Sequence, residues 1–333
     1  MDHLLEALGA AVDRRADLLA RLHAEGTDAY RLFHGVAEGA PGVTVDRYGP
    51  LLLVQTFREP IAPALVDDVA AAVSRRLGLA LEVVCNHRGA RSEGAEAHTP
   101  TAAALGDHVA REHCVQYHVR ARHRGQDPWL FLDLRRGRAA VQTLAGGKDV
   151  LNLFAYTCGV GVAAAVGGAR SVTNVDFAES ALEVGVRNAA LNGVGPERFS
   201  VLRSDCLPVL RQLAGQPVQR RGKHVPFVRV EPRKYDLIVL DPPRLAKSAF
   251  GTIDVVNDYA SLWKPALLAL AEGGTLVATN HVPTVRAADW HAALRRSSEK
   301  AGRPLRTFDA LEVDGDFPSF DGEPPLKVVV VTV

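Results

Sequence analysis

The chain has 333 residues and a formal net charge of +1, because 39 lysines and arginines nearly balance 38 aspartates and glutamates. With 47% hydrophobic and 23% charged residues, it has the composition of a folded globular protein and not of a disordered one. Its length suits one large domain or two ordinary ones. The near-neutral charge excludes nucleic-acid binding driven by the field of the whole molecule, so any RNA contact must come from local patches.

The cysteine pattern and the apolar runs indicate where such a chain would work. Cys85, Cys114, Cys158 and Cys206 are scattered without a Cys-x-x-Cys pair. This spacing argues against a metal site and a disulfide framework, and it favours reduced thiols in a cytoplasmic protein. The N-terminus is acidic and lacks a long apolar core, so we expect no signal peptide there. Since no apolar run is long enough to cross a bilayer, we expect no membrane partner.

The first third of the chain predicts a small α+β domain. The expected elements are a helix over 4–22, short strands within 31–57, a helix over 62–77 and a strand over 81–85. The basic stretch 117–124 then leads into Gly-Gln-Asp-Pro, and this shift in composition predicts a boundary near residue 125. We therefore expect an N-terminal domain over 1–125 that serves substrate recognition, and a second domain over 126–333.

In the second domain, segments typical of strands and of helices alternate. The expected strands are 150–154, 171–176, 199–202, 235–240, 275–279 and 326–333, with helices at 159–166, 180–192 and 263–271. Such alternation predicts an α/β fold with a doubly wound, mostly parallel sheet. Ligands of such sheets bind at the carboxyl ends of the strands.

Asp241-Pro242-Pro243-Arg244 follows the expected strand 235–240 directly. Each proline fixes φ and removes an N–H, which leaves a rigid backbone whose carbonyls only accept hydrogen bonds. A carboxylate and an acceptor carbonyl at the edge of the sheet could hold an amino group or a ring N–H. The alternative is that Asp-Pro-Pro only ends the strand and starts a turn.

Acidic residues also follow two earlier strands, at Asp176 and Asp205. The turn after the first strand, 154–161, is bulky and lacks the G-x-G-x-x-G register of a pyrophosphate site. A ligand with a ribose diol and an adenine but no phosphate fits better, with Asp176 accepting from the diol and Asp205 from the adenine amino group. S-adenosylmethionine is such a ligand. The alternative is that both aspartates are helix N-caps.

Several segments resemble class I S-adenosylmethionine-dependent methyltransferases, which have a Rossmann-like fold. They are 150–157, Val175-Asp176, Asn188 with Asn192-Gly193, and Leu240-Asp241-Pro242-Pro243. More narrowly, Phe131 to Arg138 and His34 to Tyr48 are similar to segments of the bacterial 23S ribosomal RNA large-subunit methyltransferases of the cytosine-C5 and guanine-N7 type. The resemblance implies S-adenosylmethionine as the cofactor and RNA, above all ribosomal RNA, as the substrate.

The resemblance also implies roles for single residues. Cofactor-binding roles fall to Asn152, Phe154, Tyr156 and Thr157 on the methionine side, Asp176 and Phe177 at the ribose and adenine, and Asp205 and Cys206 at the adenine edge. Asp241 and Pro242 would be the catalytic residues at the methyl-transfer end, and Asp241 would also contact the cofactor. Asp133 and Arg138 would close over the cofactor, with Arg138 pairing with its carboxylate; the alternative for Arg138 is a solvated helix residue. We expect Cys158 and Cys206 to pack at the pocket and not to act as nucleophiles.

The acceptor side departs from the cytosine-C5 members. In them a nucleophilic Cys follows the Gly-Gly strand, and C5 chemistry needs that thiolate because covalent attack at C6 activates C5. Here Asn280-His281 stands at that position, closer to the Asn-Asn of the guanine-N7 relatives. Leu245 replaces an aromatic residue that could stack a flipped base, and we expect no RNA-binding PUA module. The prediction is direct, in-line transfer to a base nitrogen without a covalent enzyme intermediate.

Further features bear on whether the substrate is RNA and leave two alternative functions. A basic segment over 215–234, longer than its connection needs, could contact RNA phosphates, whereas the alternative is a solvated loop. The neutral charge and Leu245 favour a small-molecule methyltransferase on the same fold. The departures at the acceptor side also suit an RNA assembly factor that binds the cofactor without turnover.

Overall fold

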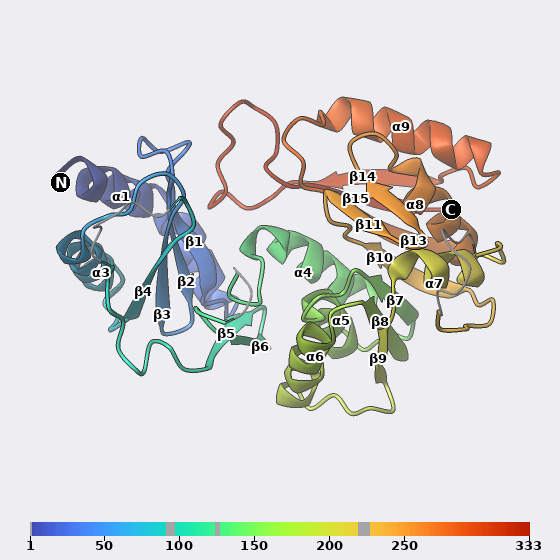
Figure 1. Ribbon diagram of the computed structural model, residues 1–333, viewed down its shortest axis with the longest axis horizontal. Helices are drawn as coiled ribbons and strands as arrows, with labels where there is room; N and C mark the ends of the chain where they lie inside the picture. Colours follow the sequence, from blue (N-terminus) through green and yellow to red (C-terminus); the bar gives the residue numbers. More distant parts are fainter. Residues whose placement is uncertain (1, 91–96, 124–126, 219–226) are drawn as a thin grey trace. The chain divides into compact units, whose positions relative to one another are not determined.

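The computed structural model describes residues 2–90, 97–123, 127–218 and 227–333 (Figure 1). Contacts within the chain divide it into two units. The first comprises Met1–Asp133 with Asp314–Gly322, and the second comprises Leu134–Val313 with Glu323–Val333. The predicted boundary at residue 125 lies outside the described residues. The first unit extends beyond it to Asp133, and the sequence analysis did not anticipate that a late segment returns to this unit.

The first unit contains a four-stranded sheet of order β1-β2-β3-β4. Its strands are β1 (Ala29–His34), β2 (Val43–Tyr48), β3 (Leu51–Thr56) and β4 (Glu82–His87). Only β3 and β4 are parallel, because helix α3 (Pro63–Leu77) carries the chain across between them. One core joins this sheet to α3 and to helices α1 (Asp2–Arg14) and α2 (Ala16–Ala24). With the hairpin β5 (His108–Glu112) and β6 (Val115–Val119), this confirms the smaller α+β unit.

Charged groups hold Asp314–Gly322 in the first unit. Asp314 Oδ1 accepts from Arg21 Nη2 at 2.8 Å, and Asp316 Oδ2 accepts from the backbone N–H of Arg31 at 3.0 Å. The guanidinium of Arg31 lies 4.6 Å from the ring centroid of Phe317. Asp314, Asp316 and Phe317 are buried, so these three side chains anchor the segment to the unit.

The second unit contains a seven-stranded sheet of order β14-β15-β13-β10-β7-β8-β9. The bounds are β7 (Asp149–Leu153), β8 (Ser171–Asp176), β9 (Phe199–Arg203), β10 (Tyr235–Leu240), β13 (Leu270–Asn280), β14 (Thr307–Leu311) and β15 (Lys327–Thr332). Only β15 runs antiparallel to its neighbours, β13 and β14. The chain order changes direction between β7 and β10, which makes this the topological switch point. The predicted doubly wound, mostly parallel sheet is confirmed.

Helices cover both faces of this sheet (Figure 1). One face carries α4 (Arg135–Leu144), α5 (Gly159–Val166) and α6 (Glu179–Leu191), and the other carries α7 (Cys206–Leu213), α8 (Ala260–Ala269) and α9 (Ala287–Lys300). Alternate residues of each strand serve the two faces. In β7, for example, Leu151 and Leu153 join the core under α7, α8 and α9, whereas Asn152 points to the α5 side.

The remaining elements are short. A one-turn helix, η1 (Leu132–Leu134), precedes α4, and a hairpin of β11 (Leu245–Ser248) and β12 (Gly251–Asp254) follows the Asp-Pro-Pro turn. All four cysteines are free thiols. Within the described part of the chain, no helix has the length and apolar character needed to span a bilayer, and no three metal-ligating side chains gather in one place.

Candidate active site

The carboxyl ends of β7, β8 and β10 bring the predicted residues to one edge of the sheet. Leu240 of β10 lies beside Leu153 of β7, which lies beside Val175 of β8. Asp176, the last residue of β8, and Asp241, which follows β10, therefore lie at the same edge. This edge borders the switch point, where ligands of doubly wound sheets bind.

The loop after β7 has a strained backbone. Phe154, Tyr156 and Cys158 have φ values of +59°, +48° and +58°, in a region that costs non-glycine residues about 1 kcal/mol or more each. Among the bonds that hold the loop, the N–H of Tyr156 donates to Asp176 Oδ2 at 2.8 Å, the N–H of Phe154 donates to Cys206 Sγ at 3.3 Å, and the N–H of Ala155 donates to the carbonyl of Val175 at 3.0 Å. Strain of this kind concentrates at ligand-binding loops.

Asp176 is oriented by two backbone groups. Its Oδ2 accepts from Tyr156 and its Oδ1 accepts from the N–H of Ala178, both at 2.8 Å. The N-cap of α6 is Ala178, so the N-cap alternative does not hold for Asp176. Asp176 is 7% exposed, whereas Phe177 beside it is 72% exposed. An ionised carboxylate offers about four lone-pair positions, so two bonds leave Asp176 acceptor capacity for a diol.

Asp205 is a helix N-cap, which the sequence offered as an alternative to adenine binding. It is the N-cap of α7, and its Oδ1 accepts from the N–H of Leu207 at 2.8 Å. The N-cap alternative therefore holds here, and an adenine amino group would need the other carboxylate oxygen. The neighbouring Cys206 donates its thiol hydrogen to the carbonyl of Val175 at 3.4 Å.

Cys158 and Cys206, the two thiols near this edge, have raised pKa values. Burial raises the pKa of Cys206 well above its ordinary value, and burial also raises the pKa of Cys158. Thiols with raised pKa values stay protonated at neutral pH, and only the thiolate is a nucleophile. Cys158 and Cys206 are therefore buried as protonated thiols, which are poor nucleophiles.

Asn152 and Thr157 are buried and take part in hydrogen bonds beside the loop that follows β7. Asn152 Nδ2 donates to Asn174 Oδ1 at 2.9 Å, and a Cβ at Gly161 of α5 would stand only 1.9 Å from that oxygen. The asparagine pair thus fills the space between the sheet and α5. Thr157 is 2% exposed, and its carbonyl accepts from Asn188 Nδ2 at 3.1 Å.

Asp241 begins the loop after β10 and is half-buried. Thr279 Oγ1 donates a hydrogen bond to Asp241 Oδ1, and the hydroxyl of Tyr259 donates to the carbonyl of Thr279 at 2.8 Å. Pro242 is buried, whereas Leu245 at the start of β11 is 56% exposed. The sequence analysis did not select Thr279 or Tyr259 as site residues. The one signal for Thr279 was its place at the end of a strand, and Tyr259 had none.

Asn280 and His281 differ in their surroundings. Asn280 is 1% exposed, with its Nδ2 donating to the carbonyl of Val255 at 3.3 Å and its Oδ1 accepting from the N–H of Val282 at 3.0 Å. Lys327 Nζ donates to the carbonyl of Val282 at 3.1 Å. Asn280 therefore stabilises the loop after β13, in which His281, unlike Asn280, is exposed.

The remaining predicted residues are Arg138, Asp133 and the basic segment 215–234, and they lie in different parts of the structure. Arg138 of α4 is 4% exposed, so the alternative of a solvated helix residue is wrong. Asp133 lies in η1 and belongs to the first unit. In the predicted basic segment, 219–226 lie outside the described residues, and the flanking 215–218 and 227–234 have neither helix nor strand. Arg233 in this segment pairs with Asp149 at 3.2 Å.

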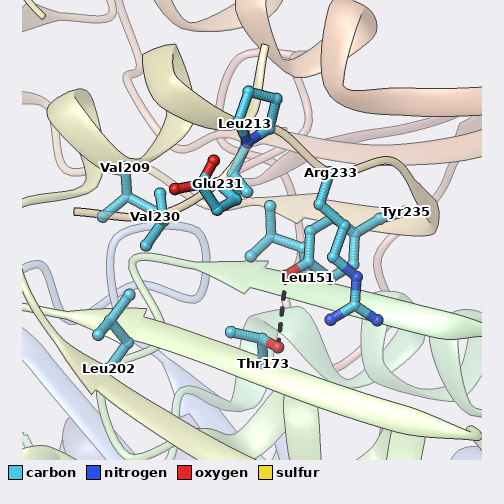
Figure 2. Close-up of a pocket in the computed structure, with 10 residues that line it drawn as sticks. Leu151, Thr173, Leu202, Val209, Leu213, Val230, Glu231, Arg233 and Tyr235 are labelled. Atoms are coloured by element: carbon cyan, nitrogen blue, oxygen red, sulfur yellow. Dashed lines mark hydrogen bonds between the residues drawn. The ribbon is translucent and has the colours of Figure 1, made fainter. Parts of the chain in front are cut away.

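Figure 2 shows a separate, mostly aliphatic pocket of about 470 Å³. It is lined by Leu151, Thr173, Leu202, Val209, Leu213, Val230, Glu231, Pro232, Arg233 and Tyr235. The hydroxyl of Tyr235 donates to that of Thr173 at 3.4 Å (Figure 2). None of the predicted site residues lines this pocket.

The chain is similar to known methyltransferases. It matches a family model of S-adenosylmethionine-dependent methyltransferases over residues 30–332. It is 32% identical over 305 residues to a ribosomal RNA large subunit methyltransferase of Deinococcus radiodurans, covering 90% of this chain and 71% of that relative. It is 29% identical over 334 residues to ribosomal RNA large subunit methyltransferase I of Aeromonas salmonicida, covering 96% and 76%.

Solved structures share the fold. An S-adenosylmethionine-dependent methyltransferase from Streptococcus mutans superposes with a TM-score of 0.77 at 24% identity, covering 99% of this chain and 80% of that one. A structure described as a methyltransferase complexed with SAH gives the same values. Because the family model covers nearly the whole chain, the protein belongs to the S-adenosylmethionine-dependent methyltransferases, and S-adenosylmethionine is its methyl donor.

Proposed function

We propose that the protein methylates a base in RNA, with ribosomal RNA as the substrate class. The observation that carries the proposal is the pair of aspartates, Asp176 and Asp241, at one edge of the sheet in a chain whose relatives are named as ribosomal RNA methyltransferases. Reduced thiols such as the four in this chain suit the cytoplasm, where such a substrate is found.

On the cofactor side, the described residues fit S-adenosylmethionine. Asp176 accepts from the ribose diol, and the exposed ring of Phe177 flanks the adenine. The strained loop with Phe154 and Tyr156 faces the methionine portion, while Asn152 and Thr157 support it from behind. Cys206 fixes this loop, and Asp205 receives the adenine amino group on the carboxylate oxygen that does not cap α7. Bound S-adenosylmethionine supplies an electrophilic methyl group.

One further charged residue of the second unit, Arg138, has a proposed role at the methionine end of the cofactor. Arg138 is buried, so its guanidinium would pair with the cofactor carboxylate in a place of low dielectric, where charge-assisted bonds are strong.

On the acceptor side, Asp241 and the carbonyl of Pro242 orient the base. A carboxylate and a carbonyl accept from an amino group or a ring N–H, so they select bases that present such donors. The edge is rigid because the two prolines fix the backbone that follows Asp241. Holding the acceptor in line with the donor is a large part of the catalysis that such a transfer needs.

We propose a base nitrogen as the acceptor atom. Methylation at cytosine C5 requires a thiolate nucleophile, whereas Cys158 and Cys206 are buried with raised pKa values and the loop after β13 presents His281. A base nitrogen attacks with its own lone pair. The transfer is then a single in-line displacement with inversion and without a covalent enzyme intermediate.

The test is methyl transfer from radiolabelled S-adenosylmethionine to bulk RNA, run beside a small-molecule extract. We expect label in RNA, and nucleoside mass mapping of a deletion strain should show one lost mark in ribosomal RNA. Label confined to the small-molecule fraction would establish the alternative substrate class. Tight SAH binding without transfer to either fraction would contradict the proposal and favour an assembly factor.

A further inference from the structure

A chain of hydrogen bonds ends on the carboxylate of Asp241. The parallel ladder between β10 and β13 ends with the pair Leu240 and Ala278, so Thr279 lies just beyond it and across from Asp241. Here the hydroxyl of Thr279 donates to Asp241 Oδ1, and the carbonyl of Thr279 accepts from Tyr259 at 2.8 Å. One residue thus links a buried tyrosine to the acceptor-side carboxylate.

This link is rigid because its inner members are buried. Thr279 is 0% exposed and Tyr259 is 6% exposed. The ring of Tyr259 stands edge-on to Trp290 with 5.3 Å between centroids, and 6.5 Å from the ring of Trp263. Burial raises the pKa of Tyr259 well above its ordinary value, and the negative charge of Asp241 raises it further. Its hydroxyl therefore keeps its proton and donates throughout the neutral pH range.

We propose that Thr279 is a positioning residue that holds the carboxylate of Asp241 toward the acceptor base, and that Tyr259 in turn holds Thr279. The inference rests on the proposed role of Asp241 in methyl transfer. The terminal torsion of an aspartate is broad, so a carboxylate needs a partner to select one orientation. A misplacement of about 1 Å at a reacting centre can lower the rate about 100-fold. The hydrogen bond from Thr279 to Asp241 Oδ1 therefore contributes to kcat.

A purely structural bond would behave differently. If Thr279 only satisfied buried polar atoms, removing its hydroxyl would lower stability and leave the turnover of the folded enzyme unchanged. A positioning residue instead lowers kcat while the affinity for SAH and the KM for RNA stay near those of the wild type. The split between kcat and these two binding constants separates the two roles.

Four variants make the test. Thr279→Val keeps the branched shape and removes the donor, whereas Thr279→Ser keeps the donor. Tyr259→Phe removes only the supporting hydroxyl. The matched control is Thr275→Val, the same substitution on the same strand, at a residue that is 4% exposed and pairs with Leu237 and Thr332, away from Asp241. Each variant is measured for thermal unfolding, SAH affinity by calorimetry, and kcat and KM for RNA.

We expect Thr279→Val to lower kcat about 10- to 100-fold, as for the loss of a hydrogen bond to a charged group, with SAH affinity and KM within about threefold. Thr279→Ser and Thr275→Val should stay within about threefold of the wild type, and Tyr259→Phe should lose about 3- to 10-fold. The proposal is overturned by a wild-type kcat in Thr279→Val, or by equal losses in Thr279→Ser and Thr279→Val. If Thr279→Val does not fold, an unchanged kcat in Tyr259→Phe overturns it.

Crystal structures of the wild type and Thr279→Val with SAH add a readout that needs no activity. We expect the Asp241 carboxylate to turn or to occupy two orientations in the variant. An unmoved carboxylate overturns the positioning role. A wild-type enzyme that methylates no RNA would overturn the proposed function, and the comparison of the two crystal structures would still decide the relation between Thr279 and Asp241.

Discussion

Asp176→Asn is the sharpest probe of the cofactor side, because it changes one atom in a well-defined hydrogen-bond arrangement. Each carboxylate oxygen of Asp176 accepts from a backbone N–H at 2.8 Å, from Tyr156 on one side and Ala178 on the other. An asparagine offers one oxygen and one NH₂ group, so one of these N–H groups then faces a donor. Hydrogen bonds to charged groups contribute about 1.5–3 kcal/mol, and the residue is 7% exposed, so we expect a stability loss of this size.

The same substitution should weaken cofactor binding more than an ordinary surface change. The ribose diol loses a charged acceptor, and the loop with Tyr156 loses an anchor that keeps its positive φ. One such bond corresponds to a 10- to 100-fold lower affinity for SAH, at about 1.4 kcal/mol per tenfold. Calorimetric titration with SAH measures the affinity, and differential scanning fluorimetry measures the melting temperature. An Asp176→Asn variant that binds SAH with wild-type affinity would refute the reasoning, whatever its stability.

Three further predictions follow from other residues. Asp241→Ala should abolish methyl transfer but keep SAH affinity within about tenfold, and retained transfer would remove Asp241 from the acceptor side. Asp205→Asn should melt within about 2 °C of the wild type, because Asn caps a helix as well as Asp does, so a loss of SAH affinity in this variant would report the adenine contact alone. Burial, followed by the charge of Arg31, lowers the pKa of His34 to about 4. Because the unfolded His34 titrates near 6.5, the unfolded state binds more protons as the pH falls, so stability should decrease from about pH 6.5 toward 4. Urea unfolding at pH 7 and pH 5 should show a smaller decrease in His34→Gln, and an equal decrease would contradict this origin.

The parallel sheet could be predicted because its signals are local. Strand β10, for example, is a short apolar run that ends at Asp241 and two prolines, and β8 ends in Asp176. The hairpin of β11 and β12 was missed because each strand has only 4 residues and β11 is largely exposed, so the pair carries too short a hydrophobic pattern. The return of Asp314–Gly322 to the first unit was missed because it depends on contacts between distant residues, such as Arg15 with Asp316, 301 positions apart.

In the candidate site too, features that depend on local sequence could be predicted, and contacts between distant residues could not. Strand ends identified Asp176, Asp205 and Asp241, because topology alone brings such residues to the carboxyl edge of a parallel sheet. The N-cap bond of Asp205 is local and was open to prediction, whereas the donors from Tyr156 to Asp176 and from Thr279 to Asp241 depend on how the sheet aligns distant segments. Thr279 lies 38 positions from Asp241 and meets it only through the register of β10 and β13.

Residues of one type in equivalent positions therefore acquire different tasks from the backbone around them. Asp205 directly precedes a helix, so one of its oxygens must satisfy an N–H at the first turn of α7. Asp176 is separated from α6 by Phe177 and Ala178, so its two oxygens are available to a strained loop and to a short turn. Asp241 is followed by two prolines, which offer no N–H, so its described donor comes from a neighbouring strand. The backbone that follows each strand therefore decides which donors reach the carboxylate at its end: a local N–H for Asp205, a distant loop and a short turn for Asp176, and a neighbouring strand for Asp241.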